Sequence, residues 1–155
     1  MDRPTRKLKG DHMRPAVETD FAPGQLEAAA ADMARILEQE PELSDFGYGL
    51  SGAEKTPEER RARFETNRQS IREPRSLAQF LAACRWLSQF AKIKTLNKRG
   101  TSYGLKHVAE REIGYCTNGV FIAAAIAEGF RVRREGRSPN AVFNISTTAW
   151  KKRNR

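Results

Sequence analysis

Lysine and arginine side chains are the groups in this sequence best suited to bind a ligand, because they are numerous and unevenly placed. The 155 residues carry 28 Lys and Arg against 19 Asp and Glu, a formal net charge of +9 at pH 7. Residues 76–155 hold fifteen basic and four acidic side chains, whereas residues 15–75 hold eight basic and thirteen acidic ones. A half so basic favours an anionic partner, and nucleic acid is the leading candidate.

The side chains that could contact phosphates fall into several stretches of the basic half. Lysine and arginine neutralise phosphates, which makes such affinity sensitive to salt. The amides at a helix N-terminus can also hold a phosphate, and arginines at a hairpin tip can enter a minor groove. Because no sheet face rich in aromatic residues is evident, duplex DNA is favoured over RNA. The predicted contacts are Lys94, Asn97, Lys98, Arg99, Tyr103, Lys106, His107, Thr117, Asn118, Arg131, Arg133, Arg134, Arg137, Lys151, Lys152 and Arg153.

Residues that could carry catalysis are few. His107 and Glu110 lie three apart, as an acid/base or metal-binding pair would, but a metal site would need a further ligand such as Cys116. Residues 76–155 contain no aspartate, and the chain has no glycine-rich phosphate loop ending in Gly-Lys-Ser/Thr. The basic setting of Cys116 could activate a thiol, yet no ordered His or Asn partner is evident. We therefore expect a non-enzymatic protein with no metal and no cofactor.

The remaining composition points to a cytoplasmic protein. Two cysteines, Cys84 and Cys116, are too few for a disulfide framework. No stretch reaches the roughly 20 apolar residues of a membrane-spanning helix, and no apolar segment of a secretory signal follows Met1. In a bacterium, we expect such a basic protein to associate with the nucleoid.

The acidic part of the chain is expected to be helical. Apolar residues at helical spacing predict a helix over residues 24–40, and a glycine-rich loop follows over residues 41–55. Thr56, followed by proline and two glutamates, predicts the start of a charged helix that runs to about residue 73. The predicted parts are a flexible basic arm at 1–22, an acidic helical extension at 23–75, and a basic core with a basic tail at 76–155.

The basic core should combine helices with a hairpin. A strongly apolar stripe predicts a central helix over 77–93, followed by a basic loop. A short helix is expected over 102–113, and a helix almost without polar side chains over 119–128. Alternating apolar residues in 130–133 and 141–145 then predict a β-hairpin. The fold class is therefore mainly α with a C-terminal β-hairpin (α+β).

This order of elements resembles a winged helix-turn-helix domain over residues 76–146. The resemblance implies DNA binding and rests on the element order, the turn at residues 114–118 and the hairpin. In that family the helix after the turn presents polar side chains to the major groove. Here residues 119–127 offer none, so the contacts are expected from Thr117, Asn118 and the surrounding cations instead.

Two functional hypotheses follow. The stretches SYGLKHVAE (102–110) and TNGVFIAAAIAEGF (117–130) are similar to small bacterial mobile-element proteins, so the first is a DNA-binding regulator or accessory factor of such an element. The alternative is a module that binds and inhibits or recruits another protein through the acidic block at residues 17–59. That block could instead fold back and mask the basic half.

Overall fold

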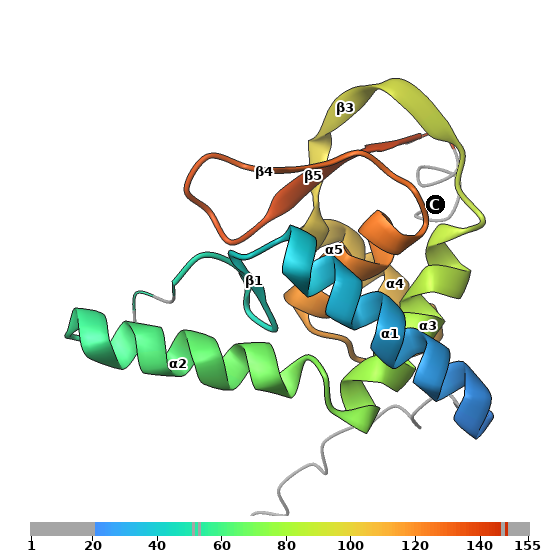
Figure 1. The fold of residues 1–155 in the computed structure, drawn as a ribbon. Coiled ribbons are helices and arrows are strands. Elements are labelled where there is room, and N and C mark those ends of the chain that lie inside the picture. The colour runs from blue at the N-terminus through green and yellow to red at the C-terminus, as the bar shows by residue number, and fades with distance from the viewer. Residues whose placement is uncertain (1–20, 51, 53, 147, 149–155) are drawn as a thin grey trace, which may run out of the picture.

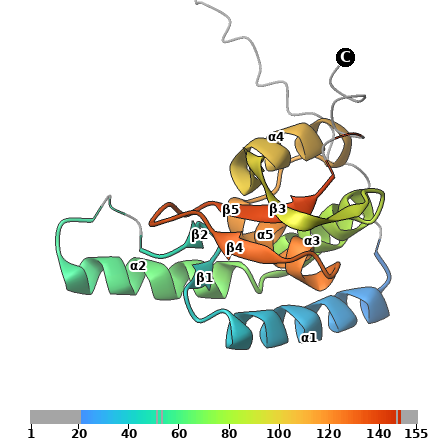
Figure 2. The same cartoon turned by 90° about the horizontal axis from the view of Figure 1, so that it is seen from above.

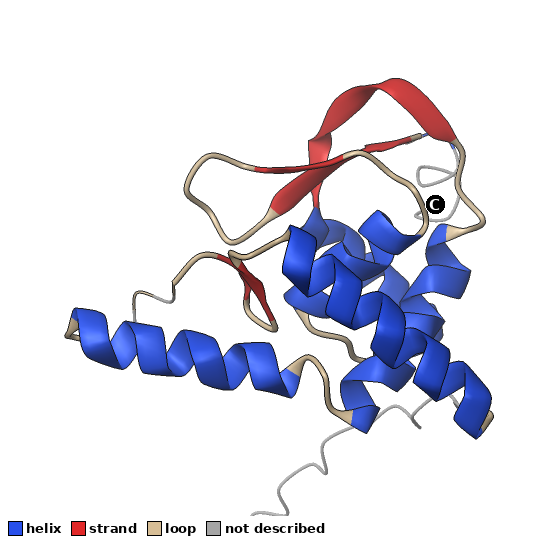
Figure 3. Cartoon of the chain, in the orientation of Figure 1, coloured by secondary structure: helices blue, strands red, loops and turns tan. Residues whose placement is uncertain are grey.

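The structure is a computed structural model that describes residues 21–50, 52, 54–146 and 148. This part of the chain is mixed α/β, with five helices and two small antiparallel sheets (Figures 1 and 3), which confirms the predicted helices and C-terminal strand region. The predicted arm lies almost wholly outside it. The elements in chain order are α1 (Pro23–Gln39), β1 (Leu43–Ser44), β2 (Gly47–Tyr48), α2 (Pro57–Ser70), α3 (Pro74–Leu87), β3 (Lys92–Thr101), α4 (Ser102–Ile113), α5 (Asn118–Ala127), β4 (Val132–Arg134) and β5 (Ala141–Ile145).

Helix α2 is solvent-exposed, as its charged sequence predicts, and most of it projects away from the core (Figure 1). Its start is capped as expected, because Thr56 Oγ1 accepts a hydrogen bond from the Glu59 amide at 3.2 Å. None of its residues is buried, and Figure 1 shows its N-terminal end far from the other helices. Near its C-terminal end, the Arg68 guanidinium donates to the backbone carbonyls of Leu37, Glu40, Pro41 and Leu43. This single side chain ties α2 to the end of α1 and to β1.

The largest departure from the predicted elements lies between α3 and α4. The helix predicted over residues 77–93 ends at Leu87, and Lys92–Thr101 forms a strand where a basic loop was expected. The alternation Lys92-Ile93-Lys94 suits a strand, and β3 pairs with β5, which lies more than forty residues further along the chain. Local helix propensity loses to this non-local pairing, so the prediction was wrong here.

The C-terminal sheet has the strand order β3-β5-β4, with both pairs antiparallel. All five residues of the central strand β5 are buried. The pairing of β3 shifts register on either side of Asn97, and the strand arches over the sheet (Figure 1). The predicted hairpin is therefore part of a three-stranded sheet with β3 and β4 at its edges.

Helix α5 is the centre of the core, as its lack of polar side chains predicts. Residues 119–125 are buried, and Phe121 lies 6.1 Å from both Trp86 and Phe143 between ring centroids. Figure 2 shows α5 behind the sheet with α4 on one side and α1 on the other, and α1, α3 and α4 all contact it. The burial of residues 119–125 leaves this part of α5 without a surface that could reach a DNA groove. None of the helices in the described part of the chain has the length and apolarity that a membrane crossing requires.

Candidate nucleic-acid interface

Exposed cations gather on the two edge strands of the C-terminal sheet. Lys94, Lys98 and Arg99 are exposed on β3, and Arg131 and Arg133 are exposed beside and within β4. Among the described residues, none of these five cations has a carboxylate within ion-pair distance. We call these five residues the sheet cations. They remain free to pair with an anion from outside the protein.

The backbone pairing determines which face of the sheet carries the side chains of Arg131 and Arg133. Arg133 lies opposite Val142, and Arg131 exchanges hydrogen bonds with Asn144, whose amide donates to the Arg131 carbonyl at 3.2 Å. Residues opposite each other in a sheet share a face, and successive residues alternate. Both arginines therefore lie on the sheet face that carries Val142 and Asn144, opposite the face from which Phe143 enters the core.

Asn97 has a structural role rather than the ligand-binding role that was predicted. Its Nδ2 donates to the Ile145 carbonyl at 3.1 Å, and its Oδ1 accepts from the Arg99 amide at 3.0 Å. These bonds satisfy backbone groups where β3 loses its regular pairing. Asn97 thus holds the arch that presents Lys98 and Arg99.

Lys106 was predicted on an exposed helix face, but it is buried. Its ammonium group pairs with Glu110, one turn further along α4, and only 5% of the residue is exposed. The i,i+4 spacing of these two residues was a visible signal for such a pair. Tyr103 and His107 are exposed as predicted, and their rings meet edge to face with centroids 4.4 Å apart.

His107 Nδ1 lies 3.4 Å from Glu110 Oε2, so the predicted pair forms a contact. In the described ranges, no group of three or more His, Cys, Asp or Glu side chains is close enough to hold a metal ion. Burial, and to a lesser extent the charge of Glu110, raises the pKa of the Cys116 thiol to about 12. A thiol with that pKa is protonated at neutral pH and is a poor nucleophile.

Arg134 braces the turn between β4 and β5. Its guanidinium donates to the carbonyls of Ser138 and Arg137, both at 2.9 Å, and lies 3.4 Å from a carboxylate oxygen of Glu42. Arg134, which was predicted to contact a phosphate, therefore already has hydrogen-bond partners within the protein. It also links the acidic and basic halves. Arg137, at the tip of the same turn, is exposed.

The N-terminus of α5 is covered by the acidic half, contrary to the prediction that it could hold a phosphate. Thr117 Oγ1 donates to Asp45 Oδ1 at 2.6 Å, and the Gly119 amide donates to the Asp45 carbonyl at 3.0 Å. Asn118 Nδ2 donates to the Phe46 and Pro139 carbonyls and to Asn140 Oδ1. The hairpin β1–β2 thus takes the place that an anion would need. Lys151, Lys152 and Arg153 lie outside the described residues.

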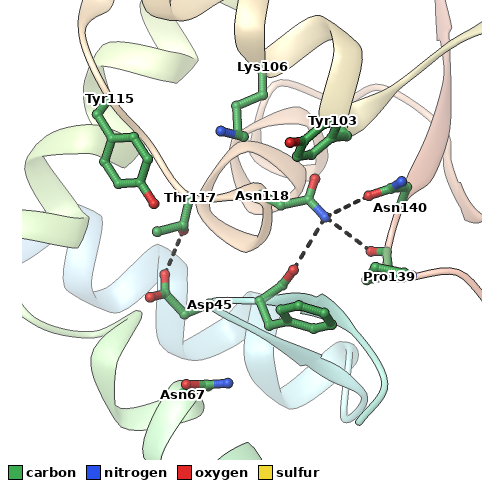
Figure 4. Close-up of a pocket in the computed structure, with 10 residues that line it drawn as sticks. Asp45, Asn67, Tyr103, Lys106, Tyr115, Thr117, Asn118, Pro139 and Asn140 are labelled. Carbon is green, nitrogen blue, oxygen red and sulfur yellow. Dashed lines mark hydrogen bonds between the residues drawn. The ribbon is translucent and has the colours of Figure 1, made fainter. Parts of the chain in front are cut away.

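A pocket of about 510 Å³ opens beside this covered helix end (Figure 4). It is formed by residues from the β1–β2 hairpin, α2, α4, the turn before α5, the first residue of α5 and the loop before β5. They are Asp45, Phe46, Asn67, Tyr103, Lys106, Tyr115, Thr117, Asn118, Pro139 and Asn140. Sequence reasoning missed it, because its walls come from segments up to about ninety residues apart.

Asp45 is the acidic group of this pocket. Burial raises the pKa of its carboxyl group above the usual 3.8, with the hydrogen bond from Thr117 acting in the opposite direction and the charge of Glu73 adding to the rise. Figure 4 shows one carboxylate oxygen bonded to Thr117 and the other directed away from it.

No protein-family model matches the chain, and comparisons with curated proteins and with solved structures return no match either.

Proposed function

We propose that this protein binds nucleic acid, chiefly duplex DNA, through phosphate contacts made by the sheet cations. The observation that carries the proposal is their arrangement. Five exposed cations lie along both edges of one small sheet, and no described carboxylate pairs with them. Phosphate neutralisation by such side chains is the main source of sequence-independent affinity for DNA.

The order α3, β3, α4, α5, β4, β5 supports a winged-helix-like domain over residues 74–145. The proposed binding mode differs from the usual one, because α5 is buried and its N-terminus is covered by β1–β2. Base readout by that helix is therefore not part of the proposal. Binding through phosphates alone fits an accessory or architectural factor better than a sequence-specific regulator.

The alternative is a protein-binding module that uses the acidic segment. Phe46 and Leu50 are exposed there, and large exposed apolar side chains favour protein contacts. The β1–β2 backbone, however, is held against α5 and Pro139 by hydrogen bonds, so this segment serves the fold whether or not it binds a partner.

Fluorescence anisotropy of a labelled duplex with the full chain, over a series of salt concentrations, tests the proposal. We expect log K to fall linearly with log salt, and the slope to shrink by about 1 for each phosphate-binding arginine removed. The variant is Arg131→Ala with Arg133→Ala. The matched control is Arg61→Ala with Arg72→Ala, which removes the same charge from exposed residues near α2. Equal weakening by both double variants, or no binding at low salt, would rule out the sheet as the interface.

A further inference from the structure

Three exposed aromatic side chains surround the pocket beside α5. Phe46, Tyr103 and Tyr115 are 43%, 53% and 68% exposed, and all three line it. In the described part of the chain they are three of the five large hydrophobic residues with such exposure. They come from a hairpin, a helix and a turn, so no single sequence pattern explains their meeting. Aromatic faces gathered at a pocket favour a ligand with a flat face of its own.

The pocket also offers hydrogen-bonding groups that the protein leaves unused. Asp45 Oδ1 accepts from Thr117, while Oδ2 has no hydrogen-bond donor among the described residues. Asn140 accepts from Asn118 through Oδ1, so its amide donors stay available. Within the described ranges, the side chain of Asn67 makes no hydrogen bond. A ligand here would meet one carboxyl group and two carboxamides.

The charges of the pocket disfavour an anionic group inside it. The Lys106 ammonium is paired with Glu110 and lies 5.6 Å and 5.2 Å from the ring centroids of Tyr103 and Tyr115. Its charge is therefore already compensated, and Asp45 faces the same space (Figure 4). Inside the pocket, a phosphate group would meet a carboxylate without a free cation to offset it, so a ligand that carries a phosphate would have to keep that group outside the pocket.

We propose that this pocket binds a nucleobase. Its flat face would stack on Tyr115 or Tyr103, and its edge would pair with Asp45, Asn67 or Asn140. Carboxamides and carboxylates match the donor and acceptor edges of adenine and cytosine, and tyrosine rings accept the faces of all bases. The base comes either from a free nucleotide or from an unpaired position in a strand. The second source rests on the proposed function, and the first does not.

Calorimetric titration of the full chain with each of the four nucleoside 5′-monophosphates tests the first source. We expect one or more to bind, with affinity at least tenfold lower in Tyr115→Ala and retained in Tyr115→Phe, which keeps the ring. Leu50→Ala is the control, because it removes an exposed apolar side chain outside the pocket. Tyr103→Ala serves as the second variant should Tyr115→Ala lose its folded circular-dichroism spectrum.

Anisotropy with two duplexes, one fully paired and one with a single bulged adenine, tests the second source. A preference for the bulged duplex that Tyr115→Ala abolishes supports the pocket. Arg131→Ala with Arg133→Ala should weaken both duplexes equally and leave that preference intact. Mononucleotide binding without any duplex binding would remove the proposed function and keep the pocket. Absence of both mononucleotide binding and bulge preference, or indifference of both to the loss of the tyrosine ring, would overturn the nucleobase proposal.

Discussion

At the N-terminus of α5, the polar groups of Thr117, Asn118 and Gly119 all find partners inside the protein. On and beside the edge strands β3 and β4, the sheet cations find no carboxylate among the described residues. The sequence had offered groups in both regions as candidate phosphate contacts. The difference shows that the availability of a group, rather than its chemical type, decides whether it can bind a ligand. A satisfied buried group stabilises the fold, and an exposed unpaired cation can serve function at little structural cost.

Gly119→Ala gives the strongest test of the covered region. An added Cβ would overlap the Ser44 carbonyl oxygen and lie 2.7 Å from the Ser44 carbonyl carbon, so the β1–β2 hairpin would have to move. We expect the free energy of unfolding to fall by about 3 kcal/mol in urea denaturation, as overpacking against backbone typically costs. Gly104→Ala is the control, because its Cβ would meet nothing within 4 Å and should stabilise α4 by up to about 1 kcal/mol. Equal effects of the two variants would show that the hairpin is not firmly docked.

The neighbouring arginines 133 and 134 test the contrast within one strand. Arg134→Ala removes bonds to two backbone carbonyls and the contact with Glu42, so we expect a loss of about 2 kcal/mol of stability. Arg133→Ala should change stability by less than about 0.5 kcal/mol, because the side chain is exposed and unpaired. DNA affinity should respond in the opposite way, with the larger decrease in Arg133→Ala. A reversed order in either measurement would break the comparison.

Asp45→Asn gives the smallest expected effect and concerns pH. The folded protein raises the pKa of Asp45 above 3.8, so the folded state binds its proton more tightly than the unfolded state does. The contribution of this proton to the free energy of unfolding is complete below pH 3.8, and it is lost as the pH rises through the pKa of Asp45 in the folded state. Asparagine cannot ionise and can still accept from Thr117. Measured by urea denaturation, the variant should therefore gain stability relative to the native protein between pH 4 and pH 7, and a constant difference would contradict the assignment.

The helices were predictable because each one carries its own apolar period, capping residue or terminating glycine. The lack of polar side chains predicted the burial of α5 without any knowledge of its neighbours. Strand β3 was missed because its stabilising partner, β5, is remote in sequence, and the local signals, four cations and a glycine, favoured a basic loop. The hydrogen bond from Thr117 to Asp45 joins residues 72 positions apart, so the local sequence around either residue could not predict it. The sequence thus identified the cations of the candidate site, but it did not reveal which of them already have partners within the protein.

The four backbone carbonyls that accept hydrogen bonds from Arg68 restrict the motion of α2 near its C-terminal end. These carbonyls anchor the C-terminal turns of the helix, while its N-terminal turns contact the adjoining segment through the bonds of Arg60 and Arg63 to Glu54. The helix is therefore anchored to α1 and β1 near its C-terminal end. In hydrogen–deuterium exchange, its amide protons should be replaced by solvent deuterium in a gradient, fastest near residue 60 and slowest near the guanidinium clamp.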